Sequence, residues 1–247
     1  MCGYVPGSGG AGIHDARIDA WPPPEVLSSP PSERVVDAPE IGAHALLAID
    51  TALGTSVALG SGGRIFEVSS DDARGHTEAI GRLIARALEL AGASPQSVTG
   101  VVAGIGPGPF TGLRVGIAAA HAFAVGRGVP LLPLLSHEAV ALAALGRGAT
   151  SAVRVVQDAR RRELFVTDFA GIDWMGAPLR HGEPRLEHRE SFAAGPGDLW
   201  PERIPAARLV QLAARRLASG REFEPDRALY LRDPDVYPPA ARKRVSS

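Results

Sequence analysis

The order of structural patterns between residues 45 and 136 restricts the fold of this chain more than any other feature. Three short apolar runs joined by glycine-containing turns predict an antiparallel meander, because tight turns connect neighbouring antiparallel strands. Helical and extended patterns then alternate. The expected elements are strands over 45–51, 55–60 and 64–70, a helix over 76–91, a strand over 98–104, a helix over 113–125 and a strand over 129–136. Because parallel strands need a crossover connection, this order leaves few topologies.

A weaker copy of this order follows in the second half of the chain. Residues 153–158 are again an apolar run that ends in aspartate, so Asp158 has the place that Asp50 has in the first unit. The remaining patterns predict strands over 163–169 and 184–188 and a helix over 205–219. The ribonuclease-H-like unit has this order of elements, and two such units facing each other make an actin-like fold.

We therefore expect an α/β protein of the actin-like (ribonuclease-H-like) class with two lobes. The first lobe is expected over 45–147, and a smaller, truncated second lobe over 148–231. Residues 1–44 are rich in proline and glycine and show no hydrophobic period, so they are expected to be a disordered extension, unless the start codon is assigned too early. Residues 232–247 are expected to be a basic, proline-containing tail.

Charge and cysteine content exclude several classes of protein. The formal net charge is -1 at pH 7, which argues against binding of nucleic acid by bulk electrostatics. Cys2 is the only cysteine, so neither an internal disulfide nor a thiolate metal cluster is expected. The sequence shows neither a membrane-length apolar run nor a signal-peptide pattern. These features predict a cytoplasmic protein with no membrane partner.

The stretch GIGPGPFTGLRVG over 104–116 is the most distinctive local motif. A glycine-rich turn before a helix suggests an anion at the helix N-terminus. The stretch fails the phosphate-binding templates, because Pro109 and Thr111 occupy the third glycine position of the G-x-G-x-x-G pattern and the Gly-Lys of a Walker loop is absent. On pattern alone, a tight strand-to-helix turn is favoured over an anion site.

Six segments together resemble the TsaB (YeaZ) family. In chain order, over residues 45–247, they are LLAIDT, HTEAI, GIGPGPFTGLRVGIAAAHAFA, VPLLPLLSHEA, VVQDARRRELF and LYLRDPD. The positions of the family motif are Gly106, Pro107, Gly108, Phe110, Thr111, Gly112, Arg114 and Gly116. The resemblance implies a role in making threonylcarbamoyladenosine beside the anticodon of ANN-decoding tRNAs.

The resemblance also implies partners. The main partner is TsaD (Kae1/Gcp), the catalytic paralogue, in a heterodimer that this chain stabilises as a non-catalytic scaffold. The ATPase TsaE belongs to a larger complex, a homodimer is a further possibility, and tRNA is contacted mainly through the complex. A homodimeric binding module without a tRNA role stays an alternative.

The resemblance to TsaD argues against catalysis by this chain. In TsaD an HxxxH pair binds the active-site metal, and the matching positions here are Ser136 and Val140. Neither can replace a histidine ligand, so we expect no catalytic residue, no metal and no cofactor. Asp50 and Asp158 are weak candidates for holding nucleotide-bound magnesium, which is the alternative of a small actin-fold ATPase or kinase.

Both helices of the first lobe are more apolar than one sheet requires, because packing on a single sheet needs an apolar stripe of only about 100°. From Val115 to Val125 the only polar side chain is His121, and small residues recur every fourth position as a smooth ridge. Cover by the second lobe is one explanation, and a partner helix is the favoured one. The predicted interface consists of Ile80, Gly81, Leu83, Ile84, Ala85, Leu88, Gly112, Gly116, Ala120, His121 and Ala124.

Overall fold

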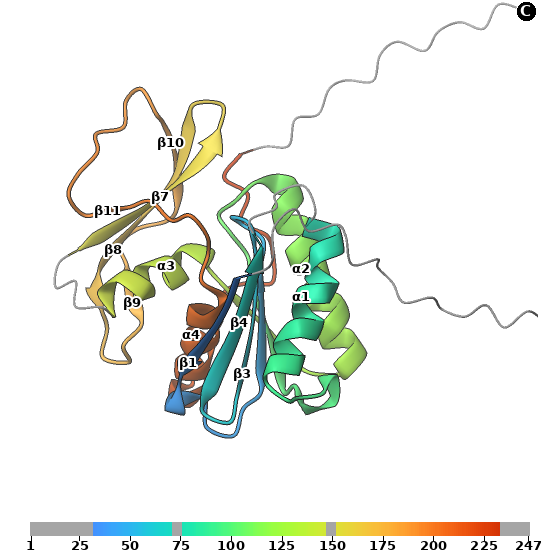
Figure 1. The fold of residues 1–247 in the computed structure, drawn as a ribbon. Coiled ribbons are helices and arrows are strands. Elements are labelled where there is room, and N and C mark those ends of the chain that lie inside the picture. The colour runs from blue at the N-terminus through green and yellow to red at the C-terminus, as the bar shows by residue number, and fades with distance from the viewer. Residues whose placement is uncertain (1–31, 71–75, 147–151, 233–247) are drawn as a thin grey trace, which may run out of the picture.

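The computed structural model describes residues 32–70, 76–146 and 152–232 (Figure 1). A six-stranded sheet forms the centre of the first lobe. Its strands lie in the order β1 (Ser32–Asp37), β4 (Arg64–Ser70), β3 (Thr55–Ser61), β2 (Leu46–Asp50), β5 (Gly100–Gly104) and β6 (Leu131–Leu134). The first four are joined in antiparallel pairs, whereas β2, β5 and β6 are parallel. The predicted meander followed by a parallel segment is confirmed.

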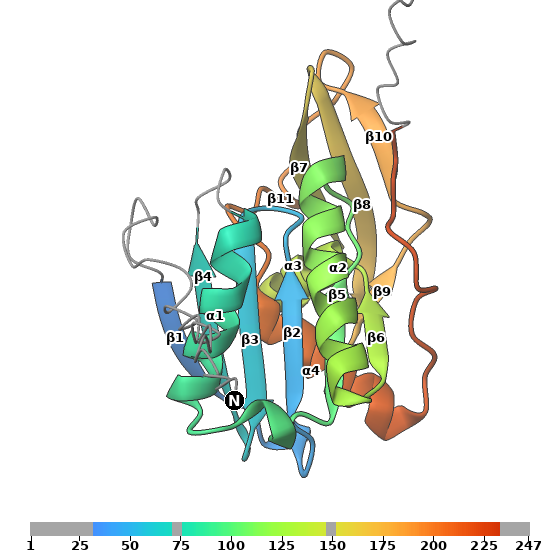
Figure 2. The same cartoon turned by 90° about the vertical axis from the view of Figure 1, so that its right-hand side faces the viewer.

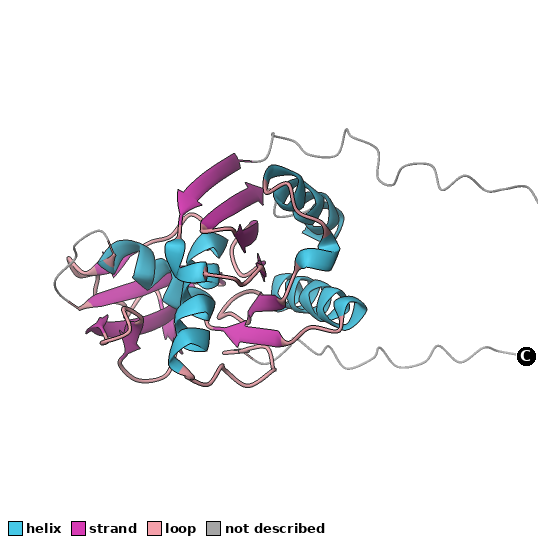
Figure 3. Cartoon of the chain, turned by 90° about the horizontal axis from the view of Figure 1, so that it is seen from below, coloured by secondary structure: helices cyan, strands magenta, loops and turns pink. Residues whose placement is uncertain are grey.

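Helices cover both faces of this sheet. α1 (His76–Leu90) and α2 (Phe110–Arg127) lie side by side on one face, and α4 (Ala206–Ser219) packs on the other (Figure 2). The view from below shows helices on both sides of the strands (Figure 3). A short 3-10 helix, η2 (Pro95–Ser97), connects α1 to β5. Among the described residues, no helix combines the length and apolar character that crossing a bilayer requires.

The position of α4 differs from the expected one. The sequence predicts the helix over 205–219 within the second lobe, but α4 packs against β2 and β3 of the first sheet and against α3 (Ser136–Leu145). Its buried stripe, including Leu209, Val210 and Leu212, fills the core between the two lobes. The reason is that the back of the six-stranded sheet presents buried apolar side chains, including Leu46, Ala58 and Val102, for this stripe to cover.

The second lobe contains a smaller sheet with α3 against it. Its strands lie in the order β10 (Arg185–His188), β8 (Glu163–Ile172), β7 (Val153–Arg160) and β11 (Asp198–Leu199), and β9 (Pro178–Arg180) pairs with the far end of β8. The strands predicted over 153–158, 163–169 and 184–188 are confirmed. β9 and β11 are not predicted, because two or three residues are too few to show a period.

Residues 32–44 correct the expected boundary of the disordered extension. β1 pairs with β4 as an edge strand, from Ser32 opposite Ser69 to Asp37 opposite Arg64. The 3-10 helix η1 (Pro39–Ile41) then places the fully buried Ile41 against α4. The sequence pattern missed β1 because most of its side chains are exposed, as on many edge strands. The rest of the expected extension, residues 1–31, lies outside the described residues.

The segment after α4 returns along the first lobe, and we call residues 221–232 the C-terminal strap. The Glu224 N–H donates to Pro133 O at 3.1 Å, and the Leu229 N–H donates to Ile105 O at 2.8 Å. Arg232 forms an ion pair with Glu163 at the start of β8. The strap therefore joins β6, the loop before α2 and the β7–β8 hairpin. Residues 233–247 of the expected tail lie outside the described residues.

Candidate functional site

An apolar groove is lined by side chains of α1 and α2. Figure 2 shows these two helices side by side, nearest the viewer. The volume of the groove is about 660 Å³, and among the described side chains Arg114 is the only charged one that lines it. Gly81, Ala118 and Ala122 are exposed to solvent, so the groove is open along its length. Val125, at the far end of α2, is 79% exposed. The lining residues are Ile80, Gly81, Ile84, Arg114, Val115, Ala118, Ala119, Ala122 and Phe123.

The small-residue ridge of α2 faces the chain's own sheet. The Thr51 hydroxyl donates to Gly112 O at 2.6 Å, and a Cβ added to Gly116 would lie 2.1 Å from Thr51 Oγ1. Ala120 and Ala124 are buried in the core between the helix pair and the sheet. The prediction that this ridge receives a partner helix is therefore wrong. The small residues let α2 approach the end of β2, which a larger side chain would prevent.

The other predicted interface residues are divided between core and surface. Ile80, Gly81 and Ile84 line the groove, whereas Leu83 and Leu88 are buried in the core. Ala85 is exposed on α1, and His121 is half-exposed with its Nε2 2.9 Å from the Asp226 carboxylate of the C-terminal strap.

Five groove residues on α2 are not among the predicted interface residues. The signal was present, because α2 is apolar on every side and so must have an apolar outer face. Choosing the face with the smallest residues selected the side that packs on the sheet. The missed residues are Val115, Ala118, Ala119, Ala122 and Phe123.

The glycine-rich motif forms the turn between β5 and α2. Gly106 has a φ of +104°, a region that favours glycine, and a Cβ added to Gly108 would lie 2.8 Å from Ala52 Cα. Pro107 is buried in this turn and Thr111 is exposed. The turn packs tightly against the loop that follows β2, which agrees with the favoured interpretation from the sequence.

Two family segments meet at the start of α2. The Phe110 ring lies 4.8 Å from the Tyr230 ring of the strap, and the Arg114 guanidinium lies 3.7 Å from the centre of the Phe110 ring. Arg114 Nε also donates to the Tyr230 hydroxyl at 3.1 Å. The strap is therefore held at one end of the groove by aromatic and cation–π contacts.

Asp50, at the end of β2, is buried in a hydrogen-bonded network. The Ser136 hydroxyl donates to Asp50 Oδ2 at 2.5 Å, and the Ala52 N–H donates to Oδ1 at 2.8 Å. The Gly106 N–H donates to Ser136 Oγ at 3.1 Å, so the network reaches the glycine-rich turn. Burial raises the pKa of Asp50 to about 6, although both hydrogen bonds to the carboxylate act against this rise. Asp50 thus ties β2 to the start of α3.

His137, the next residue along α3, is bonded to the second sheet, which in turn contacts the loop after β2. Its Nε2–H donates to Gln157 Oε1 at 3.2 Å, and its Nδ1 accepts from the Thr167 hydroxyl at 2.8 Å. The Gln157 side-chain amide in turn donates to Ala52 O at 2.8 Å. Burial lowers the pKa of His137 to about 4, so the ring is neutral at physiological pH. This arrangement suits a structural link between the lobes.

Asp50→Asn is expected to change how stability depends on pH. Folded Asp50 holds its proton to a higher pH than the unfolded residue does, so its contribution to stability falls as pH rises from 3.8 to about 6. His137 acts oppositely, because its lowered pKa makes stability rise between about 4 and 6.5. Asp50→Asn lacks the fall due to Asp50 and keeps the rise due to His137, which is up to about 3 kcal/mol at 1.36 kcal/mol per pKa unit, so its stability should rise with pH relative to that of the wild type. Melting temperatures from pH 4 to 7 measure the difference between the two proteins.

Asp158→Asn is the matched control, since Asp158 is exposed and its removal should leave a curve parallel to that of the wild type. Parallel curves for Asp50→Asn as well would contradict the account of Asp50.

Asp50 and Asp158 are not equivalent in the structure. The Asp158 carboxylate is exposed, accepts the Arg160 N–H at 2.9 Å and lies 3.6 Å from Arg189. Among the described residues, no group of three or more His, Cys, Asp or Glu side chains is placed to hold a metal ion. The two aspartates therefore lie in different surroundings, Asp50 in a buried hydrogen-bonded network and Asp158 at an exposed turn.

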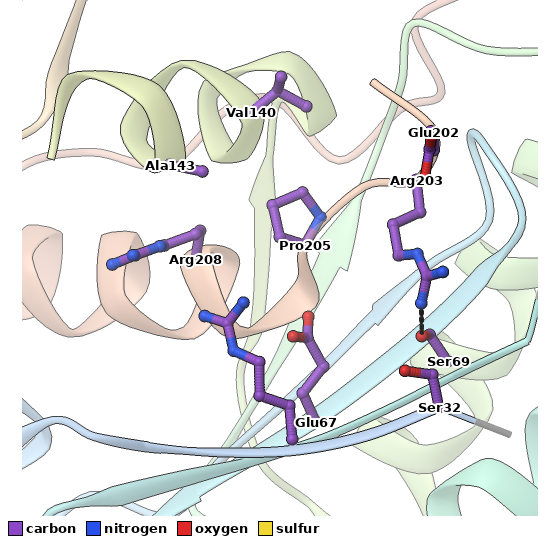
Figure 4. Close-up of a pocket in the computed structure, with 10 residues that line it drawn as sticks. Ser32, Glu67, Ser69, Val140, Ala143, Glu202, Arg203, Pro205 and Arg208 are labelled. Carbon is purple, nitrogen blue, oxygen red and sulfur yellow. Dashed lines mark hydrogen bonds between the residues drawn. The ribbon is translucent and has the colours of Figure 1, made fainter. Parts of the chain in front are cut away.

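A polar cavity of about 590 Å³ lies where the β1–β4 edge meets the start of α4 (Figure 4). Arg203 donates to Ser69 Oγ at 2.7 Å across it, and Glu67 accepts the Ala207 N–H at 3.0 Å. Glu67 thereby satisfies a free donor in the first turn of α4. None of the residues predicted for the interface, the motif or a cofactor lines this cavity.

Comparisons with known proteins match the chain to a TsaD family model, to TsaB proteins and to uncharacterized mycobacterial proteins. A family model described as "TsaD: tRNA N6-adenosine threonylcarbamoyltransferase" matches residues 67–179. The "tRNA threonylcarbamoyladenosine biosynthesis protein TsaB" of Escherichia coli is 32% identical over 206 residues, which are 79% of this chain and 82% of that protein. An uncharacterized protein of Mycobacterium tuberculosis is 39% identical over 94 residues, or 38% of this chain. The chain spans 42% of the length of that mycobacterial relative.

Two solved structures from Pseudomonas aeruginosa resemble the fold. One is an uncharacterized protein with similarity to peptidase YeaZ, with a TM-score of 0.68 and 24% identity over 76% of this chain and 100% of that chain. The other is YeaZ, with a TM-score of 0.64 and the same identity and coverage. At this identity the likeness concerns the fold, which is the expected two-lobed, actin-like α/β architecture. Because it is 32% identical to the Escherichia coli protein over 82% of that protein's length, the chain belongs to the TsaB (YeaZ) family.

Proposed function

We propose that this chain is a non-catalytic subunit of the cytoplasmic machinery that makes threonylcarbamoyladenosine in tRNA, and that it acts by binding and stabilising TsaD. The observation that carries the proposal is the open apolar groove between α1 and α2. Exposed contiguous apolar surface on a folded protein marks an interaction site. A groove between two parallel ridges of small and aliphatic side chains accommodates a helix from a partner.

The surroundings of α3 support a non-catalytic role. By the family resemblance, Ser136 and Val140 stand where TsaD has its metal-binding histidines. Ser136 is fully buried and already bonded to Asp50 and Gly106, and Val140 is apolar. His137, the histidine between these two positions, is held by Gln157 and Thr167. In this proposal the metal chemistry belongs to TsaD, and TsaE joins the larger complex.

Ala118→Arg is expected to abolish pairing with TsaD while the fold remains intact. Ala118 is exposed in the groove, so the new guanidinium stays in water in the free chain but would have to be buried, unpaired, under a partner helix. We expect the dissociation constant for the organism's own TsaD to rise at least 100-fold, measured by calorimetric titration. The circular dichroism spectrum and melting temperature should match those of the wild type.

Ala218→Arg is the matched control, because Ala218 is an exposed helical alanine on α4, away from the groove. It should pair with TsaD as the wild type does. If Ala118→Arg folds and still pairs at wild-type affinity, the groove is not the TsaD site. If the wild-type chain forms only a homodimer that Ala118→Arg dissociates, the groove serves a second copy of the chain instead.

A further inference from the structure

The turn between β7 and β8 has an unusual backbone. Its three consecutive arginines, Arg160, Arg161 and Arg162, have φ values of 64°, 54° and 61°. This left-handed region is unfavourable for residues with a Cβ, and glycine, asparagine or aspartate normally occupy it. Arginine has no short polar group that could compensate locally. Strained backbone of this kind is a feature of functional sites.

Surrounding segments fix this turn. The pairing of β7 with β8 shifts register between Asp158 and Arg160, and a bulge of this kind redirects neighbouring side chains. The Asp158 carboxylate accepts the Arg160 N–H at 2.9 Å, and the Arg189 N–H donates to Arg162 O at 2.7 Å. Arg232 of the C-terminal strap donates to Ala159 O at 3.3 Å. The turn is therefore a defined, supported structure at one end of the second sheet (Figure 2).

The surface around the turn is positively charged. Within the described part of the chain, five arginines gather here against three carboxylates, whereas the formal net charge of the whole sequence is -1. Two of the ion pairs are exposed: Arg162 with Glu190 at 3.3 Å, and Arg189 with Asp158 at 3.6 Å. Exposed pairs contribute little to stability and exchange readily for another anion. The arginines are Arg160, Arg161, Arg162, Arg189 and Arg232, and the carboxylates are Asp158, Glu163 and Glu190.

We propose that this arginine turn contacts the phosphate backbone of tRNA. The inference rests on the proposed function, which supplies the tRNA, and adds a contact surface on this chain. Guanidinium groups bind phosphate oxygens in a bidentate manner, and a projecting hairpin tip can reach phosphates along a helical RNA. The tip has no exposed apolar side chain that could enter a bilayer, since Ala159 is buried. A basic surface without apolar side chains fits an RNA backbone.

The test compares two variants that lose the same charge. Arg161→Gly with Arg162→Gly removes two guanidinium groups and places glycine where φ is positive, so the fold should be at least as stable as the wild type. Arg34→Gln with Arg64→Gln removes two exposed guanidinium groups from β1 and β4 of the first sheet, and serves as the control. Each full chain, with TsaD, is titrated against an unmodified ANN-decoding tRNA transcript at several salt concentrations, and fluorescence anisotropy is recorded.

The glycine variant is expected to bind tRNA about tenfold more weakly, with the slope of log affinity against log salt reduced by about 1.5, because two phosphate contacts are lost. The control should keep the wild-type slope. An unchanged slope in the glycine variant, or an equal loss in both variants, overturns the inference. Loss of TsaD pairing in the glycine variant also overturns it, because the turn would then be a protein contact.

Pairing is measured separately by size-exclusion chromatography, so that failure of the proposed function is recognised. If the wild-type chain does not pair with TsaD, the proposed function fails. The same two variants are then compared as isolated chains with the same transcript. Equal salt slopes for the glycine variant and its control, or no tRNA binding by the isolated wild-type chain, overturn the inference in this case as well.

Discussion

Ala120→Trp is expected to unfold the first lobe. Ala120 is 0% exposed, on the side of α2 that packs against the first sheet, within a core that includes Leu83 of α1 and Val101 of β5. A well-packed core cannot accept a ring without moving α2 away from the sheet. The loss in free energy of unfolding should exceed about 3 kcal/mol, the upper part of the range for overpacking by a few methylene groups. Urea denaturation followed by circular dichroism measures it.

Ala118→Trp, two residues earlier on the same helix, is the matched control. Ala118 is exposed, so the same ring should change the free energy of unfolding by no more than about 0.5 kcal/mol. Gly116→Ala gives a graded form of the test, because the added Cβ would lie 2.1 Å from Thr51 Oγ1. If Ala120→Trp folds normally while Ala118→Trp does not, the orientation of α2 is the reverse of the one described.

The sequence did not show which face of α2 packs on the sheet. The period of an apolar helix tells how wide its apolar surface is, but α2 is apolar on every side and has no preferred direction. Small residues at every fourth position indicate a close approach without saying what approaches. In α2 they meet Thr51 at the end of β2, a contact between residues 61 positions apart in the sequence. Only the folded structure shows whether these small residues pack against the chain's own sheet or against a partner helix.

The strands were predictable from the sequence where they are apolar runs between turns. β2, β3 and β5 of the first sheet and β7 of the second are buried apolar runs bounded by turns. β1 was not predictable, because its side chains face solvent and its stability comes from pairing with β4. The place of α4 was not predictable either, since its amphipathic pattern indicates a buried stripe without indicating the sheet that buries it.

The surroundings of the candidate site were predictable only in part. The resemblance places Ser136 and Val140 at the positions of metal ligands, and the chemistry of those side chains already argues against a metal. The hydrogen bond from Ser136 to Asp50 joins residues 86 positions apart in the sequence, so no local sequence pattern could predict it. The same holds for the buried ion pair between Glu138 and Arg216, which lie on α3 and α4.

The ion pair between Glu138 and Arg216 is buried and connects several elements of the fold. Arg216 Nη2 lies 3.0 Å and 2.8 Å from the two carboxylate oxygens of Glu138, and both side chains are 6% exposed. Arg216 Nη1 also donates to Glu222 O of the C-terminal strap at 3.0 Å. Burial raises the pKa of Glu138, and Arg216 acts against that rise. The pair thus joins α3, α4 and the strap, where Glu224 lies 3.8 Å from the same guanidinium.

Removing either partner is expected to cost about 3–5 kcal/mol at pH 8, because a buried charge loses its direct hydrogen-bonded partner. The two single variants should differ at lower pH. In Arg216→Met, Glu138 can take up a proton, since burial favours its neutral form; stability lost at pH 8 should therefore return as pH falls toward 5. In Glu138→Gln, Arg216 cannot lose its proton, so the loss should persist at both pH values.

The double variant Glu138→Leu with Arg216→Met is the control, because an apolar pair of similar volume leaves no buried charge. It should be more stable at pH 8 than either single variant. Free energies of unfolding at pH 5 and pH 8, each referred to the wild type at the same pH, give all three comparisons. Equal losses for Arg216→Met at the two pH values would show that Glu138 does not become protonated, and that solvent or Arg180, which also lies near this carboxylate, stabilises its charge instead.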